Sequence, residues 1–134
     1  MDKKDSKQGY MQLQLIMNQL SQLQEQFRMI DAQILELGSI RNSVDELQDI
    51  KKGSEILAPI STGIFVKSEL KNNKNFIVNI GGGITVSKDQ DQLMEFLDRQ
   101  LNEIRKVQTE LLTRIQSLNL QSEYLKKEMS KFVN

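Results

Sequence analysis

Residues 54–86 read SEILAPISTGIFVKSELKNNKNFIVNIGGGITV, and this stretch decides the fold. Its β-branched and aromatic residues gather in short runs, a composition typical of β-strands. The runs are Ile56 to Ala58, Ile64 to Val66, Phe76 to Val78, and Ile84 with Val86. The stretch therefore predicts four short strands within residues 54–87.

Turn-forming residues separate these runs. Pro59 ends the first run, because proline cannot donate a backbone hydrogen bond, and residues 61–63 form its turn. Asn72 and Asn73 form the next turn, and residues 81–83 are three glycines, which tolerate positive φ. The strands therefore pair as two hairpins.

The three glycines could also cradle a phosphate, as glycine-rich loops do in nucleotide-binding proteins. A P-loop needs a lysine and a serine or threonine directly after its last glycine, followed by a helix. Here Ile84, Thr85 and Val86 follow, and these residues predict a strand. A tight turn or bulge is the better interpretation.

The predicted strands carry consecutive apolar residues, so both faces of each hairpin are hydrophobic. About thirty residues cannot cover both faces by themselves. Other subunits must bury them, and we expect this segment to drive oligomerisation. The oligomerisation residues are predicted to be Ile64, Phe65, Val66, Phe76, Ile77, Val78, Ile84 and Val86.

A long helix is predicted before this segment, over residues 6–52. Its apolar residues recur at spacings of three and four, which is the heptad pattern of a coiled coil. Lys51, Lys52 and Gly53 supply the cations and the glycine expected at a helix C-terminus. The seam consists of Leu13, Ile16, Leu20, Leu23, Phe27, Ile30, Ile34 and Leu37.

A second long helix is predicted over residues 88–132, with Ser87 and Gln90 as a capping box. Two helices of similar length can cover each other's apolar stripe in an antiparallel hairpin. Placing Ile50 level with Lys88 sets Leu37 near Leu101 and Leu13 near Leu125. The predicted fold is α+β, mainly α: one domain over residues 1–134, with a coiled-coil hairpin closed by two β-hairpins.

Composition excludes several classes of function. The chain contains no cysteine and no histidine, so thiol or imidazole catalysis and metal binding through these groups are excluded. Lysine plus arginine equals aspartate plus glutamate, at 18 each, which gives no electrostatic footprint for nucleic acid. Residues 1–8 lack an apolar signal core, and no apolar run reaches the length of a membrane span. We expect a cytoplasmic, non-enzymatic protein without cofactor, metal, nucleic acid or membrane partner.

The β segment resembles one known family. Glu55–Ile60 (EILAPI), Gly63–Leu70 (GIFVKSEL) and Gly81–Lys88 (GGGITVSK), placed between two coiled-coil helices, are similar to the α-class subunit of prefoldin. The β class of that family has one hairpin instead of two. The resemblance covers essentially the whole chain.

The resemblance implies a chaperone that works without nucleotide. It implies a hexamer of two α-class and four β-class subunits, whose hairpins form a double β-barrel body from which six coiled coils project. Their tips hold unfolded proteins and pass them to a group II chaperonin. A generic coiled-coil scaffold or tether without chaperone activity is the alternative, and it explains the heptads equally well.

Apolar residues outside the seam gather near the free ends of the two predicted helices. A coiled coil needs apolar residues only along its seam, so these could merely thicken it. With the resemblance, we interpret them as a client-binding surface, to which flexible methionine side chains are suited. The predicted set is Met11, Leu15, Met17, Leu120, Tyr124, Met129, Phe132 and Val133.

Overall fold

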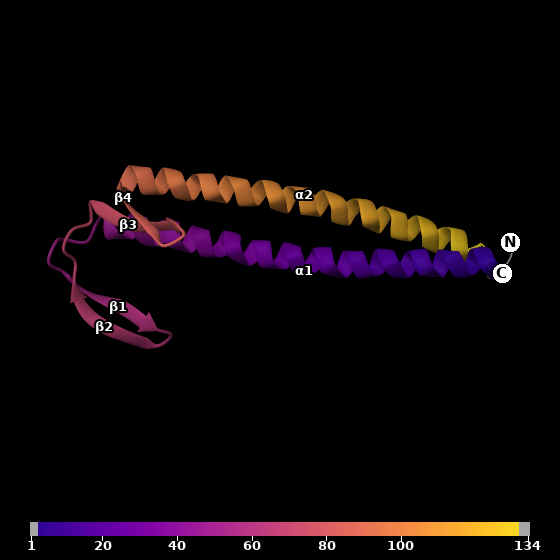
Figure 1. Ribbon diagram of the computed structural model, residues 1–134, viewed down its shortest axis with the longest axis horizontal. Helices are drawn as coiled ribbons and strands as arrows, with labels where there is room; N and C mark the ends of the chain where they lie inside the picture. The colour runs from indigo at the N-terminus through magenta and orange to yellow at the C-terminus, as the bar shows by residue number, and fades with distance from the viewer. Residues whose placement is uncertain (1–2, 132–134) are drawn as a thin grey trace. The chain divides into compact units, whose positions relative to one another are not determined.

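The structure of the protein, a computed structural model, describes residues 3–131. It contains two helices and two antiparallel hairpins, so the predicted α+β, mainly α fold is confirmed (Figure 1). The elements in chain order are α1 (Lys3–Leu47), β1 (Glu55–Ser61), β2 (Ile64–Glu69), β3 (Asn75–Gly81), β4 (Ile84–Asp89) and α2 (Gln90–Ser130).

The chain divides into two compact units. The first comprises Met1–Leu35 and Asn102–Asn134, and the second comprises Glu36–Leu101. In neither helix of the described chain is there a stretch long and apolar enough to cross a membrane.

The first unit is a coiled-coil seam between α1 and α2. Leu20, Leu23, Leu111 and Ile115 are buried in it, and each leucine contributes roughly 1.5–3 kcal/mol through the apolar area removed from water. The Ser122 hydroxyl lies 3.9 Å from Met17 Sδ. The predicted register set residue 121 opposite Met17, so it agrees with the contact to within one residue.

The second unit contains the last part of α1, the first part of α2 and both hairpins. Val44 of α1 and Leu93 and Leu97 of α2 form its buried cluster, against which Phe76 and Val78 of β3 pack. In the same unit, Arg41 Nε donates to Asp98 Oδ1 at 2.7 Å, again one residue from the predicted register. The β3–β4 hairpin is therefore anchored on the helices by the apolar residues of one face.

Helix α1 ends at Leu47, not at residue 52, and no basic residue lies in its last turn. Residues 48–50 continue with i→i+3 bonds, the tighter pattern that closes many helices. The carbonyls of Leu47, Gln48 and Ile50 accept hydrogen bonds from the Asn73 side-chain amide at 3.0, 3.1 and 3.1 Å. The helix end is thus satisfied by a residue of the later linker, which local sequence signals cannot reveal.

Helix α2 begins at Gln90, two residues after the predicted start, because a different residue caps it. Asp89 Oδ1 accepts from the Gln92 backbone N–H at 2.8 Å, and Gln92 Oε1 accepts from the Asp89 N–H at 3.0 Å. This reciprocal pair is a capping box. The predicted box of Ser87 and Gln90 is wrong, since Ser87 is still paired with Ile77 in the β3–β4 ladder.

Pro59 does not end the first strand. Strand β1 continues to Ser61, and Pro59 lies opposite Phe65 of β2. Each sheet has only two strands, so every strand is an edge strand, where a proline without an N–H is tolerated. The turn at Asn72 is built by its side chain, whose Oδ1 accepts from the N–H groups of Lys74 and Asn75.

Replacing Asn73 with alanine is expected to lower the free energy of unfolding by about 1 kcal/mol, because the last carbonyls of α1 lose their amide donor. Urea denaturation followed by circular dichroism measures the change. Asn42→Ala, at an exposed position inside α1, is the matched control and should leave stability unchanged or slightly higher. An N73A variant as stable as N42A would contradict this role.

Candidate interaction surfaces

An open groove lies between α1 and α2 in the first unit. Its volume is about 620 Å³. Four aliphatic residues and one tyrosine alternate with three glutamines around it, and none of the described side chains that line it is charged. The lining residues are Gln12, Leu15, Ile16, Gln19, Leu120, Gln121, Tyr124 and Leu125.

The groove has a floor and two walls that follow from helix periodicity. Ile16 and Leu125 belong to the seam and are half-buried, so they form the floor. Leu15, Leu120 and Tyr124 lie beside the seam, with exposed fractions of 61%, 69% and 65%. Large apolar side chains exposed at this level, around a hollow, form a surface suited to a nonpolar ligand.

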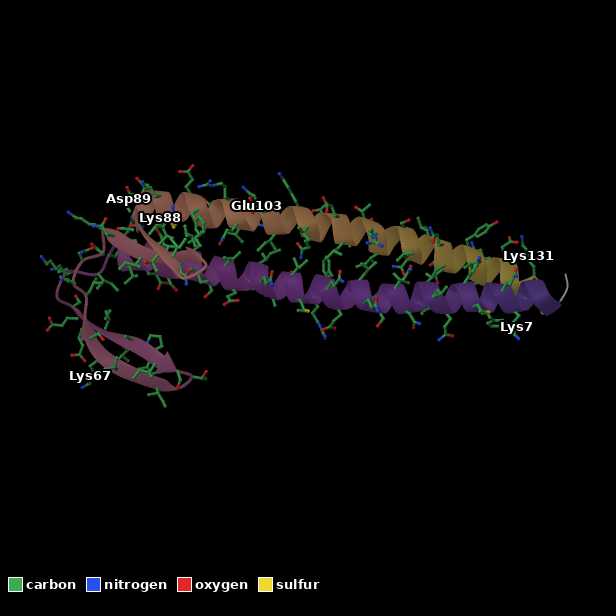
Figure 2. The ribbon with its side chains drawn as sticks, viewed as in Figure 1. Lys7, Lys67, Lys88, Asp89, Glu103 and Lys131 are labelled. Atoms are coloured by element: carbon green, nitrogen blue, oxygen red, sulfur yellow. The ribbon has the colours of Figure 1, made fainter. Side chains whose placement is uncertain are left out.

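The other predicted tip residues lie outside the groove lining. Met11 and Met17 are exposed, and Met129 is half-buried against Gly9, where an added Cβ would lie 3.5 Å from Met129 Cγ. Phe132 and Val133 fall outside the described residues. Figure 2 places Lys7 and Lys131 at the same end of the helix pair, as the proximity of Gly9 to Met129 requires.

Sequence reasoning missed part of this surface. Tyr10 is 59% exposed on α1, one residue before Met11. Seam residues Ile16 and Leu125 were assigned only to the coiled coil, although both line the groove. The signal that could have found them is the cluster of off-seam residues itself, since side chains on both sides of a seam define a groove above it.

One buried residue beside the groove is polar. Ser122 occupies a seam position and is only 4% exposed, and its hydroxyl contacts the Met17 sulfur, a weak acceptor. A leucine in this position would add to the packing, so the serine makes this part of the seam weaker than the part at Leu111 and Ile115. The groove thus lies beside the least apolar point of the seam.

An exposed ion pair lies within α1. Arg28 pairs with Glu25 one turn away, and the hydrogen bond from Arg28, together with its charge, holds the pKa of Glu25 below its usual value. Both residues are exposed, and pairs of this kind contribute little to stability. We interpret them as solvated surface.

The hairpins form the second candidate surface. Five of the predicted oligomerisation residues are exposed: Ile64 (56%), Phe65 (56%), Val66 (46%), Ile77 (81%) and Ile84 (59%). Phe76, Val78 and Val86 are half-buried, and the first two pack on the helices of their own chain. Leu57, Ile60 and Ile80 are also exposed, and the prediction omitted them.

These features, two long paired helices joined by two hairpins with exposed apolar faces, can be compared with known proteins. The family model for prefoldin subunits matches residues 16–134. The chain belongs to the prefoldin family. It is an α-class chaperone subunit, because its curated relatives are prefoldin α subunits.

Among these relatives, the prefoldin subunit alpha of Methanobrevibacter smithii is 34% identical over 97 residues, which cover 72% of this chain and 66% of the relative. That of Methanococcus vannielii is 28% identical over 122 residues, or 91% and 82% of the two chains. The fold is similar to filamentous PFD from Methanocaldococcus jannaschii, with a TM-score of 0.77 at 17% identity over 86% of this chain and 95% of that one.

Replacing the buried Ser122 with alanine is expected to raise the free energy of unfolding by about 0.5–1 kcal/mol, because a poorly paired hydroxyl leaves the seam. Thermal melting followed by circular dichroism measures the gain. Ser117→Ala, at an exposed site of α2, has the same change in helix propensity and is the control. If S122A gained no more than S117A, the seam at Ser122 would not be the weak point described above.

Proposed function

We propose that this prefoldin subunit holds unfolded or nascent polypeptides in the groove between α1 and α2, without catalysis or nucleotide. The observation that supports this most is the groove itself, about 620 Å³ in volume, with apolar walls and a rim of glutamines. A nonpolar segment gains free energy by leaving water there, and the neutral glutamines can bond to its backbone. Such a surface accepts many sequences because it fixes no charge pattern.

We further propose that the subunit works in a hetero-hexamer with a second copy of itself and four β-class subunits. The exposed faces of the hairpins support this, since two-stranded sheets with apolar faces are not stable in water by themselves. Shared burial of these faces would gather several helix pairs around one body. Delivery of the client to a group II chaperonin completes the proposal, on the grounds of family membership.

A chaperone must bind its client firmly and still release it. Several grooves that bind one client at the same time would meet both requirements. A single open groove binds weakly, because little of the client surface is enclosed. Linked sites raise the overall affinity by about 10²–10⁴ through effective concentration, while each contact still dissociates readily. A chaperone with several arms can therefore hold a client firmly and still hand it on.

A scaffold or tether without chaperone activity is the competing function. It accounts for the seam of α1 and α2 but gives no role to the exposed residues of the groove. An aggregation assay with a denatured test protein distinguishes a chaperone from a tether. A chaperone suppresses the aggregation, whereas a tether does not.

The triple variant Leu15→Ser, Leu120→Ser and Tyr124→Ser is expected to assemble normally but to lose most of its aggregation suppression, because the walls of the groove become polar. Light scattering of a denatured client, at equal concentrations of assembled chaperone, measures the loss. Native mass spectrometry establishes that assembly is intact.

The matched control changes three exposed apolar residues that do not line the groove: Met29→Ser, Leu35→Ser and Leu112→Ser. This control should protect the client as well as the unaltered protein does. Equal protection by both triple variants would refute the groove as the client site.

A further inference from the structure

The two hairpins are copies of one another at a spacing of 20 residues. Aligning Glu55–Glu69 with Asn75–Asp89 matches Ile60 with Ile80, Gly63 with Gly83, Ile64 with Ile84 and Val66 with Val86. The acidic ends also match, since Glu69 aligns with Asp89. No shift of the alignment is needed along the 15 residues.

The structures of the two hairpins repeat as well. In β1–β2, Ala58 pairs with Val66 and Pro59 with Phe65, and the register then shifts before Ser61. In β3–β4, Val78 pairs with Val86 and Asn79 with Thr85, and the shift comes before Gly81. Each pair and each irregularity recurs 20 residues later. The two hairpins are therefore equivalent units, and equivalent positions lie on equivalent faces.

One face carries three apolar residues and one polar residue in both hairpins. Because side chains alternate across a strand, Phe76, Val78, Val86 and Lys88 share a face of β3–β4, and Ile56, Ala58, Val66 and Ser68 share the equivalent face of β1–β2. We call this the anchor face. The opposite face is not repeated in the same way, since Phe65 aligns with Thr85.

The contacts of the β3–β4 anchor face indicate which kind of surface is complementary to it. Phe76 and Val78 pack on the cluster of Val44, Leu93 and Leu97 at the ends of the two helices. On the same face, Lys88 Nζ lies 5.3 Å from the centre of the Phe96 ring of α2. A pair of helix ends that presents leucine, valine and phenylalanine is therefore the complementary surface.

On the anchor face of β1–β2, Ile56, Ala58 and Ser68 are half-buried, as their equivalents in β3–β4 are, whereas Val66 is 46% exposed and its equivalent Val86 is half-buried. Neither Ile56 nor Ala58 belongs to the apolar cluster at the helix ends, against which Phe76 and Val78 pack. We propose that the anchor face of β1–β2 docks on the helix ends of a neighbouring prefoldin subunit, as its copy docks on α1 and α2 of its own chain. This inference rests on the proposed assembly and assigns one face and one kind of partner surface to it.

The neighbour must have helix ends whose apolar cluster is open. A second copy of this chain does not meet this condition, because its own β3–β4 hairpin occupies the cluster of Val44, Leu93 and Leu97. The neighbour on which β1–β2 docks is therefore a different subunit of the assembly. Leucine, valine or aromatic residues are exposed at the ends of its paired helices.

Site-specific photo-crosslinking tests the assignment in the full assembly. The chain has no cysteine, so one introduced cysteine carries a benzophenone at a single position. Ser68→Cys places it on the anchor face of β1–β2, Lys88→Cys on the anchor face of β3–β4, and Lys67→Cys on the opposite face of β1–β2. Figure 2 labels Lys67 on the β1–β2 hairpin and Lys88 on the β3–β4 hairpin.

We expect the probe at position 68 to attach to the helix ends of a different subunit. The probe at position 88 should attach to α2 of its own chain near Phe96, and the probe at position 67 should attach to no helix end. Mass spectrometry of the digested products locates each attachment.

Attachment from position 68 to strands alone, or to a second copy of this chain, would overturn the inference while the assembly stands. Native mass spectrometry of the unaltered chain mixed with a β-class subunit is the separate check. If no defined hetero-oligomer forms there, the proposed assembly itself fails.

Discussion

The packing of one face of β3–β4 on the ends of the two helices determines which hairpin is anchored and which is left exposed. Phe76 and Val78 occupy the cluster of Val44, Leu93 and Leu97, which fixes β3–β4 to the second unit. Asn73 adds a polar tie, because its amide bonds to the last carbonyls of α1 just before that strand begins. With β3–β4 held in this way, β1–β2 has no equivalent surface among residues 3–131 of its own chain. Exposed apolar residues on such a hairpin are suited to an interface with another subunit.

The two units show opposite uses of apolar residues. In the second unit, apolar residues close a junction between strands and helices. In the first, the seam continues through Leu111 and Ile115 and then meets Ser122, beside which the walls of the groove stand exposed. Apolar residues in the heptad seam thus hold the helices together, whereas apolar residues next to the seam form an exposed surface. The proposed client surface and the exposed hairpin faces therefore consist of different residues.

Much of the fold could be predicted from residues 54–86 and the heptads around them. Both hairpins follow from local composition, and the helix register, set by placing Ile50 level with Lys88, agrees to within one residue with the contact of Arg41 with Asp98. The helix ends were predicted incorrectly, because Asn73 caps α1 from 26 residues away and Asp89 competes with Ser87 for the cap of α2. The groove was predicted only as a group of residues. Its lining depends on which off-seam side chains flank Ile16 and Leu125, and this is a property of two helices together.

The neutral lining of the groove has a consequence for the conditions in which the protein can work. Attraction between charges weakens as dissolved ions screen them, whereas the tendency of nonpolar groups to leave water does not depend on that screening. In the proposed function, binding in a groove lined by Leu15, Leu120, Tyr124 and glutamines therefore changes little with ionic strength.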